Sequence, residues 1–142
     1  FFDDLQLKIA AKIDKININK FFARTGATVG KTYIYKKNDG QVYHAGYLIR
    51  ARIKKFFDPY FIYLQTLTDE YKNWVVIMST RTGQPGINAE EYSSLKLKIP
   101  CLQEQKKIAD YFTLLDKIIS AETKILESMR EMKKGLLQKL FV

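Results

Sequence analysis

Residues 101–142, CLQEQKKIADYFTLLDKIISAETKILESMREMKKGLLQKLFV, decide the fold of this chain. The stretch has no proline, and Gly135 is its only glycine, so little in it interrupts a helix. Two series of residues recur every seven positions, namely Ile108, Leu115, Glu122, Met129 and Leu136, and Tyr111, Ile118, Ile125 and Met132. This a/d pattern, sustained for about four heptads, predicts a coiled-coil helix roughly 50–60 Å long.

A helix with an apolar seam needs another surface to cover it in water. The rest of the sequence predicts no helix of comparable length, so we expect the seam to pair with a helix of another chain. Glu122, at an a position, would be costly against an apolar partner and would set register or orientation. The alternative is that the helix packs along its own domain. A domain of about 100 residues is too small to cover the whole stripe.

Residues 1–100 have a different character, with Gly, Asn, Thr and aromatic residues between short alternating segments. We therefore place a boundary near Ile99-Pro100, with a globular domain over 1–100 and the long helix over 101–142. Because the chain opens FFDDLQ without Met, we expect that part of the domain lies upstream. The predicted fold class is α/β (α+β), with several short strands and one helix in the middle.

The strand predictions rest on alternation. In residues 47–54 the apolar side chains of Ile49, Ala51 and Ile53 alternate with basic ones, as in a strand buried on one face, and residues 95–99 alternate in the same way. Apolar residues at 5, 7 and 9 and at 16 and 18 suggest earlier strands, and WVVIM at 74–78 is interpreted as a buried strand. Asp58-Pro59 predicts the start of a helix that ends near Asn73.

The net charge is +9 and is unevenly distributed. Residues 1–100 hold 16 Lys/Arg against 9 Asp/Glu, a balance of +7, and residues 101–142 hold 8 against 6. A basic globular domain is consistent with a polyanionic partner, because neutralised phosphates release counterions. Many basic proteins bind no nucleic acid, so charge alone does not decide.

The segment RTGATVGKT at 24–32 is similar to a phosphate-binding P-loop, but Gly26 and Gly30 are separated by three residues where the motif has four. We therefore do not predict a nucleotide site. Residues 24–26 and 81–83 repeat Arg-Thr-Gly, each after a predicted strand. Arginine suits phosphate or a guanine edge, and the amides of Gln84 and Asn88 suit an adenine edge. Two ordinary polar turns would explain the same residues.

A basic strand face at 50–54 could follow a phosphate backbone, although a solvated sheet face has the same pattern. The candidate DNA-binding residues are Arg24, Thr25, Lys31, Arg50, Arg52, Lys54, Arg81, Thr82, Gln84 and Asn88.

The sequence gives little support for an enzyme. Phe57-Asp58-Pro59-Tyr60 is similar to the Asp-Pro-Pro-Tyr turn of amino-methyltransferases, but one Pro is missing and helix capping explains Asp58. A single Cys and a single His exclude an internal disulfide and a multi-Cys zinc site. We expect no catalysis, metal or cofactor in this chain. No apolar run approaches the roughly 18 residues of a membrane span, and we expect a cytoplasmic protein.

Several segments together resemble the specificity (S) subunit of type I DNA restriction–modification systems. They are AGYLIRAR (45–52), RTGQPGIN (81–88), SSLKLKIPCLQEQKKIADYFTLLDKII (93–119) and KKGLLQKLF (133–141). The most specific part is Ile99-Pro100, followed by LQEQ at 102–105 and then Ile108-Ala109 and Leu115-Asp116. RTGATVGKTY (24–33) is also similar to a segment of the target recognition domains in this family.

The resemblance implies a function. An S subunit of this family carries two target recognition domains, each followed by a long helix, and each domain reads one half of a split DNA site. Two modification subunits methylate adenine at N6 with S-adenosylmethionine, and restriction subunits use ATP and Mg²⁺. The S subunit itself is not catalytic. Residues 1–100 would be one recognition domain, and 101–142 would be a spacer and dimerisation helix.

The chain departs from this pattern because it holds one recognition domain and one helix. It is therefore either the second half of a full-length subunit or a half-size subunit that dimerises through the helix, in a prokaryotic cytoplasm. Its expected partners are double-stranded DNA, modification subunits and restriction subunits. An alternative is a scaffold that binds modification subunits without reading DNA.

Overall fold

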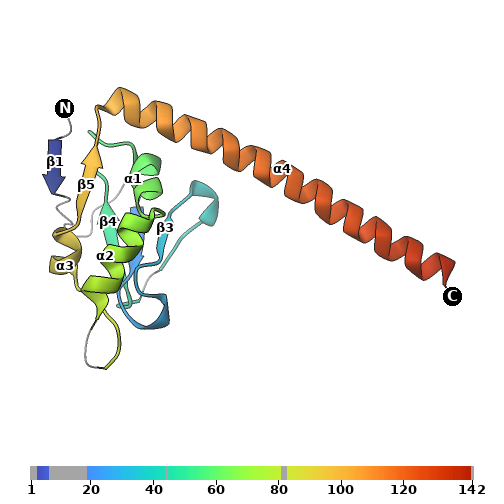
Figure 1. Ribbon diagram of the computed structural model, residues 1–142, viewed down its shortest axis with the longest axis horizontal. Coiled ribbons are helices and arrows are strands. Elements are labelled where there is room, and N and C mark those ends of the chain that lie inside the picture. Colours follow the sequence, from blue (N-terminus) through green and yellow to red (C-terminus); the bar gives the residue numbers. More distant parts are fainter. Residues whose placement is uncertain (1–2, 7–18, 44, 81–82, 142) are drawn as a thin grey trace. The chain divides into compact units, whose positions relative to one another are not determined.

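The computed structural model describes residues 3–6, 19–43, 45–80 and 83–141 (Figure 1). The chain divides into two compact units, Phe1–Lys106 and Lys107–Val142. The strands are β1 (Asp3–Gln6), β2 (Asn19–Ala23), β3 (Thr32–Ile34), β4 (Leu48–Arg52) and β5 (Lys96–Ile99). The α-helices are α1 (Pro59–Gln65), α2 (Asp69–Ser79), α3 (Ala89–Ser93) and α4 (Leu102–Leu140), and the 3₁₀ turns are η1 (Gly26–Thr28) and η2 (Lys37–Asp39). The mixed α/β fold with a long C-terminal helix is thus confirmed.

The first unit contains two small antiparallel sheets. Strands β1 and β5 pair with each other, and Leu5 lies opposite Leu97. The second sheet has the order β3-β2-β4, and the central β2 places Phe22 opposite both Thr32 and Ile49. Figure 1 shows β1 beside β5, the first and last strands of the unit. Chain segments almost 100 residues apart are therefore joined by backbone pairing.

The apolar residues that alternate along the strands form the core, as predicted for β4 and β5. Ile49, Ala51 and Ile53 are buried, and Leu95, Leu97 and Ile99 are buried while Lys96 and Lys98 are exposed. On β2, Phe22 contacts the ring of Tyr92 on α3 at 5.0 Å between centroids, and Lys20 Nζ lies 5.3 Å from the ring centre of Tyr63 on α1. One face of β2 therefore packs against helices α1 and α3.

The middle of the chain differs from the prediction of one helix and a following strand. Helix α1 begins as predicted, with the Asp58 carboxylate accepting from the Phe61 amide at 2.8 Å, but it ends at Gln65. Thr68 then caps a separate helix, α2, which contains Asp69 and Glu70 in its first turn. The prediction of a helix continuing to Asn73 is wrong.

The interpretation of WVVIM (74–78) as a buried strand is also wrong, because these residues lie within α2. Its buried side chains, Tyr71, Val75 and Ser79, are spaced four apart, whereas Val76 and Ile77 are 66% and 73% exposed. A short apolar run does not by itself distinguish strand from helix. The segment 81–83 therefore follows a helix and not a strand. The predicted strand residues Leu7, Ile9, Ile16 and Ile18 lie outside the described residues.

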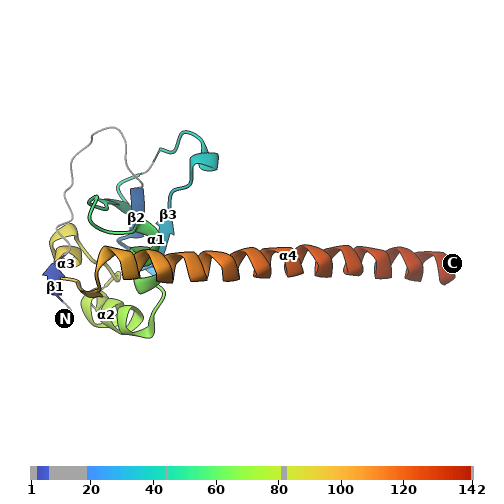
Figure 2. The same ribbon diagram turned by 90° about the horizontal axis from the view of Figure 1, so that it is seen from above.

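Helix α4 is continuous over 39 residues, which confirms the long helix that the heptads predict (Figure 2). At about 1.5 Å per residue it is about 58 Å long. Helices α1, α2 and α3 have 7, 11 and 5 residues, so the described part of the first unit offers no helix of matching length. In its first turn, Gln105 is buried, accepts from the Asp58 amide at 3.0 Å and donates to the Pro100 carbonyl at 2.8 Å.

Candidate nucleic-acid interface

The first loop, residues 24–30, leaves the sheet at the end of β2 and returns into β3. Its neck is closed by the Ala23 amide, which donates to the Lys31 carbonyl, and by the Gly30 amide, which donates to the Ala23 carbonyl, both at 2.9 Å. Gly30 has φ +81°, and a Cβ there would lie 2.4 Å from Val75 Cγ1. Only glycine fits this position, because both the backbone conformation and the space exclude a side chain.

The second loop, of which residues 83–87 are described, lies directly against the first. The Gly26 amide donates to the Pro85 carbonyl at 3.0 Å, and the Ile87 amide donates to the Arg24 carbonyl at 2.8 Å. Thr25 and Gly86 form an isolated antiparallel bridge. The two Arg-Thr-Gly segments that the sequence singled out therefore belong to one site. Arg81 and Thr82 themselves lie outside the described residues.

The loop pair presents a group of polar and basic side chains. Arg24, Lys31 and Gln84 are exposed, and a Cβ on Gly26 would lie 3.2 Å from Gln84 Nε2. The Thr25 hydroxyl is half-buried and donates to the Pro85 carbonyl at 3.4 Å, so it also joins the loops. Of the candidate residues in the described part of the chain, Arg24, Thr25, Lys31 and Gln84 are the ones that the structure brings together.

Tyr47 is a residue of this surface that the sequence reasoning missed. Its carbonyl accepts from the Arg24 amide at 3.0 Å, and its side chain is 71% exposed. Because β2 and β4 pair with Ala23 opposite Leu48, Tyr47 lies one step beyond, opposite Arg24. This position depends on the pairing register of two strands, and nothing in the local sequence indicates it.

The first loop is not arranged as a phosphate cradle, in agreement with the sequence reasoning. A P-loop points successive amides at a phosphate and leads into a helix. Here the Gly26, Val29, Gly30 and Lys31 amides all donate to protein carbonyls. The loop leads into strand β3.

The basic residues of β4 do not join the loop pair. Arg50 and Arg52 are half-buried, and Arg52 Nη2 is buried without a hydrogen-bond partner among the described residues. Lys54 is exposed but follows the end of β4 that pairs with Asn19, whereas the first loop lies at the opposite end. At about 3.3 Å per residue, Lys54 is about 20 Å along the strand from Leu48.

Two further residues have structural uses. Asn88 caps α3. Its side-chain oxygen accepts from the Glu91 backbone amide at 2.8 Å, and its own backbone amide donates to the Glu91 carboxylate at 2.6 Å. Asp58 caps α1, which accounts for the Asp-Pro segment without a substrate amine. The side-chain oxygen of Asn88 is thus engaged within the fold.

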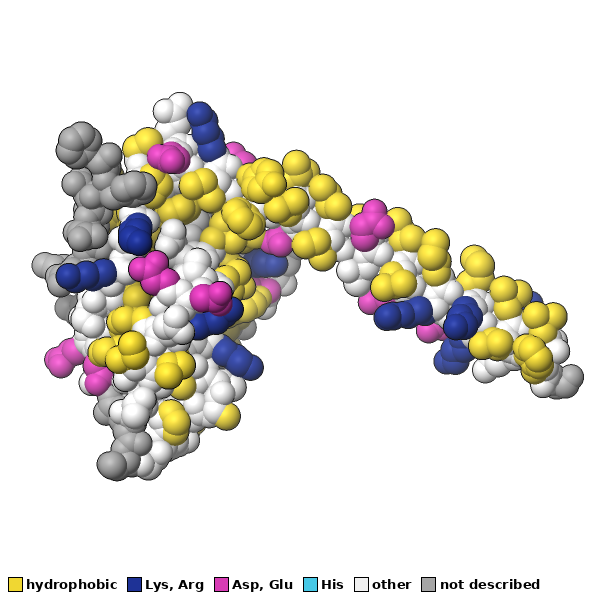
Figure 3. Space-filling model, in the orientation of Figure 1, with side chains coloured by type: hydrophobic (Ala, Val, Ile, Leu, Met, Phe, Trp, Pro, Cys, Tyr) yellow, Lys and Arg dark blue, Asp and Glu magenta, His cyan; other side chains and the backbone are white. Residues whose placement is uncertain are grey.

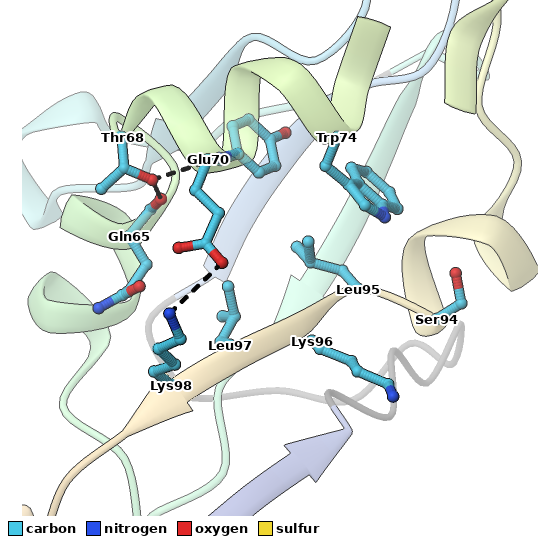
Figure 4. Close-up of a pocket in the computed structure, with 10 residues that line it drawn as sticks. Gln65, Thr68, Glu70, Trp74, Ser94, Leu95, Lys96, Leu97 and Lys98 are labelled. Atoms are coloured by element: carbon cyan, nitrogen blue, oxygen red, sulfur yellow. Dashed lines mark hydrogen bonds and ion pairs between the residues drawn. The ribbon is translucent and has the colours of Figure 1, made fainter. Parts of the chain in front are cut away.

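Figure 4 shows a pocket of about 270 Å³ between α2 and β5. The Glu70 carboxylate lies 3.8 Å from the Lys98 ammonium across it, and both side chains are more than two-thirds exposed. Trp74 and Leu95 line the pocket as well. With one lysine paired to a carboxylate, this lining is less suited to a phosphate than the loop pair is.

In residues 3–6, 19–43, 45–80 and 83–141, no group of three or more His, Cys, Asp or Glu side chains is placed to hold a metal ion. No helix in the same residues is long and apolar enough to cross a membrane.

Helix α4 presents the predicted seam to solvent along most of its length. Ile118 and Ile125 are about half exposed, and Met129 and Met132 are 61% and 65% exposed. Tyr111, Glu122 and Leu136 are exposed too, while Ile108 and Leu115 are partly buried. Figure 3 shows hydrophobic side chains along α4, beside charged ones.

A further row follows each d position by one residue and was missed in the heptad assignment. Its members are Phe112, Ile119, Leu126 and Leu140, with Lys133 as the interruption, and the apolar members are 42–72% exposed. The signal was in the sequence, at the same seven-residue spacing. An a/d/e stripe is wider than a two-stranded seam and is typical of a bundle helix.

A basic loop pair on a small α/β unit, followed by a long helix with an uncovered apolar stripe, is typical of a module that binds a polyanion and assembles with other helices. Comparison with known proteins agrees with this class. Residues 4–130 match the type I restriction modification DNA specificity domain. The chain belongs to this family.

Curated relatives have the same description. The chain is 30% identical over 115 residues to the putative type I restriction enzyme MjaX specificity subunit of Methanocaldococcus jannaschii, covering 80% of this chain and 27% of that protein. It is 27% identical to the MjaVIII specificity subunit of the same organism over 116 residues, 82% of this chain and 26% of the relative. It is 33% identical over 86 residues to the HindI specificity subunit of Haemophilus influenzae, 59% of this chain and 19% of the relative. The matched region is thus about a quarter of the first two relatives.

Proposed function

We propose that this chain reads one half of a bipartite DNA site and directs adenine-N6 methylation and restriction there by partner subunits. One observation carries the proposal: two loops with exposed Arg24 and Gln84 are hydrogen-bonded side by side in a unit of net positive charge, in a chain of the DNA specificity family. Arginine and glutamine are side chains that read guanine and adenine edges.

We assign different roles to the candidate residues. Arg24 and Gln84 read bases, together with Arg81 and Thr82, which complete the second loop in sequence. Lys31, beside the neck of the first loop, and Lys54, two residues beyond the far end of β4, contact phosphates. Because Arg50 and Arg52 are half-buried, they contribute mainly to the positive electrostatic potential of the unit. Thr25 and Asn88 mainly make hydrogen bonds that stabilise the fold.

We assign to α4 the role of spacer and assembly element. Its open stripe is covered by a second such helix, either from another half of a longer subunit or from a second copy of this chain. An isologous pairing of two copies would be antiparallel and would read a palindromic split site. The row at 112, 119, 126 and 140 gives the stripe a second flank, on which modification subunits can pack. S-adenosylmethionine, ATP and Mg²⁺ belong to the partner subunits in this proposal.

The test is to express the chain with its modification subunit and to sequence the methylated adenines of the host genome. A split motif is expected. Gln84→Ala should change which bases the motif specifies, whereas Lys54→Ala should lower methylation at all sites alike. Lys124→Ala on α4 is the matched control and should leave the motif and level unchanged. If Gln84→Ala and Lys54→Ala act equally on every site, the division between base and phosphate contacts fails.

The exposed stripe of α4 also suits a scaffold that holds modification subunits without reading DNA. Gel shifts of the assembled complex across salt concentrations separate the two functions. A DNA reader loses affinity with a log–log slope of about −0.9 per phosphate contact, and the Lys54→Ala variant reduces that slope by about 1. Binding that requires the modification subunit but is insensitive to every loop substitution would favour the scaffold.

A further inference from the structure

Two buried tyrosine hydroxyls meet the neck of the first loop. The Tyr71 hydroxyl, from α2, donates to the Gly30 carbonyl at 2.8 Å. The Tyr92 hydroxyl, from α3, donates to the Ala23 carbonyl at 2.9 Å. Tyr71 and Tyr92 are 4% and 0% exposed. The residues that begin and end the loop are therefore each held by a side chain from a different helix.

The tyrosines are themselves fixed by an aromatic cluster. The Trp74 ring lies 6.1 Å from Tyr71 and 5.7 Å from Tyr92, and Phe22 lies 5.0 Å from Tyr92. Burial raises the pKa of both tyrosine hydroxyls, so they are protonated and able to donate near neutral pH. The cluster holds the donors in place because its rings share contacts.

The same two helices flank the second loop, which runs from the end of α2 at Ser79 to the Asn88 cap of α3. The Gly86 amide donates to the Ser79 carbonyl at 3.3 Å. The segment from 71 to 92 thus supplies both the second loop and the two hydroxyls that hold the first. Both hydroxyls therefore link the first loop to the segment that carries the second.

The space around the first loop makes these contacts important. A groove that is largely open to solvent lies between the loop and α2, lined by Val29, Lys31, Leu67 and Val76 among others. Beside it, Gly30 approaches Val75 closely and its carbonyl accepts from the Tyr71 hydroxyl, and these contacts hold the loop to α2. Removal of that hydroxyl takes a donor from a buried carbonyl, which is costly and favours a shift of the loop.

We propose that Tyr71 and Tyr92 are positioning residues for sequence discrimination, which hold the first loop against the second so that Arg24 and Gln84 read adjacent bases as one surface. The inference rests on the proposed function and deepens it. The tyrosines touch no DNA. They act through the loop, so they affect the choice between sequences more than the attraction to phosphates, which depends on the charge of exposed lysines and less on the exact position of the loop.

The experiment uses the chain assembled with its modification subunit. The cognate motif is first determined from the sites that the wild-type complex methylates. Methylation rates are compared on an oligonucleotide duplex with that motif and on duplexes with one base pair changed. Tyr71→Phe, and independently Tyr92→Phe, should lower the ratio of cognate to altered rates about tenfold. Ile99→Val, a conservative change at a buried residue of β5, alters neither a hydroxyl nor a ring of the cluster and should leave the ratio unchanged. Amide hydrogen exchange should accelerate at Gly26, Gly30 and Lys31 and not across β4.

Each outcome of this experiment supports or overturns a specific part of the proposal. If the wild-type chain specifies no motif, the proposed function itself fails. If it specifies one and both Tyr→Phe variants keep the wild-type ratio, only the positioning role fails. An equal loss in Ile99→Val, or exchange that accelerates across the whole unit, would assign the effect to general packing and overturn the inference. Working at a temperature where thermal melts show every variant folded keeps the comparison valid.

Discussion

The first loop and helix α4 both present exposed side chains, but they are held in different ways. The Gly30 carbonyl is held by a hydroxyl 41 residues further along the chain. Helix α4 is built from bonds between residues four apart, and even the Thr123 hydroxyl turns back to the Ile119 carbonyl of its own helix. Long-range contacts fix the shape of the loop, whereas the helix has an apolar stripe that only a further surface can bury. The described loop pair is therefore built by contacts within the first unit, whereas the apolar stripe of α4 stays exposed.

The largest predicted effect is a loss of stability on substitution in the core of the first unit. Phe22→Ala should lower the free energy of unfolding by about 3–5 kcal/mol, because Phe22 is 1% exposed and contacts Tyr92. Phe56→Ala, at a side chain 76% exposed, should change it by less than about 0.5 kcal/mol. Urea unfolding followed by tryptophan fluorescence of Trp74 measures both. Equal losses would mean that the buried face of β2 is not the core.

The next effect concerns the stripe of α4. Ile118→Asp with Ile125→Asp should weaken assembly through the helix at least about 100-fold, since two carboxylates would be buried in an apolar contact. Sedimentation velocity at tens of micromolar and co-purification with the modification subunit measure assembly. Ser120→Asp, at the f position on the opposite side of the helix, is the matched control and should leave assembly intact. A wild-type chain that stays monomeric under these conditions would count against the homodimer, and the co-purification would then test pairing with other helices.

The smallest effect is a pH dependence confined to the first unit. Burial lowers the pKa of Lys20 to about 6, and its ammonium nitrogen has no hydrogen-bond partner among the described residues. Between that value and about 10.4 the unfolded chain binds a proton that the folded chain does not. This group therefore makes the free energy of unfolding rise with pH over that range, by up to about 1.4 kcal/mol per unit, and contributes no slope below about pH 6.

Lys20→Met should remove this slope and stabilise the unit at pH 7, while assembly through α4 stays unchanged. Lys55→Met, at an exposed lysine, is the control and should retain the wild-type slope. Urea titrations at pH 6, 7 and 8 measure it. A Lys20→Met chain with the wild-type slope would show that Lys20 keeps its proton in the folded state.

The features that could be predicted from the sequence are those with a local cause. A heptad pattern can be recognised within a single segment, so α4 and most of its apolar stripe could be predicted from residues 108–136. Alternation and the Asp58 cap are also local, and β4, β5 and the start of α1 followed from them. Residues 74–78 were misassigned because five apolar residues in a row fit either structure, and the Thr68 cap with two following acidic residues was the stronger signal.

The candidate site was only partly accessible from the sequence, since its geometry is non-local. The repeated Arg-Thr-Gly drew attention to both loops, but their contact depends on the bond between Ile87 and Arg24, which are 63 residues apart. The same is true of Tyr47, and of Tyr71 and Tyr92, whose sequence neighbours indicate only helices. In contrast, Arg52 and Asn88 were chosen by residue type. The burial of Arg52 depends on the fold, whereas Glu91, three residues after Asn88, was a local signal for a helix cap that the sequence reasoning missed.

The Gln105 side chain, bonded to residues 58 and 100 at the root of α4, has a mechanical consequence. About 50 Å of helix separates it from Leu140, so a tilt of about 4° at the root would swing the far end by 3–4 Å. That distance is about one step along a DNA strand. In the proposed spacer role, the rigidity of this helix root therefore sets how precisely α4 fixes a distance along the DNA.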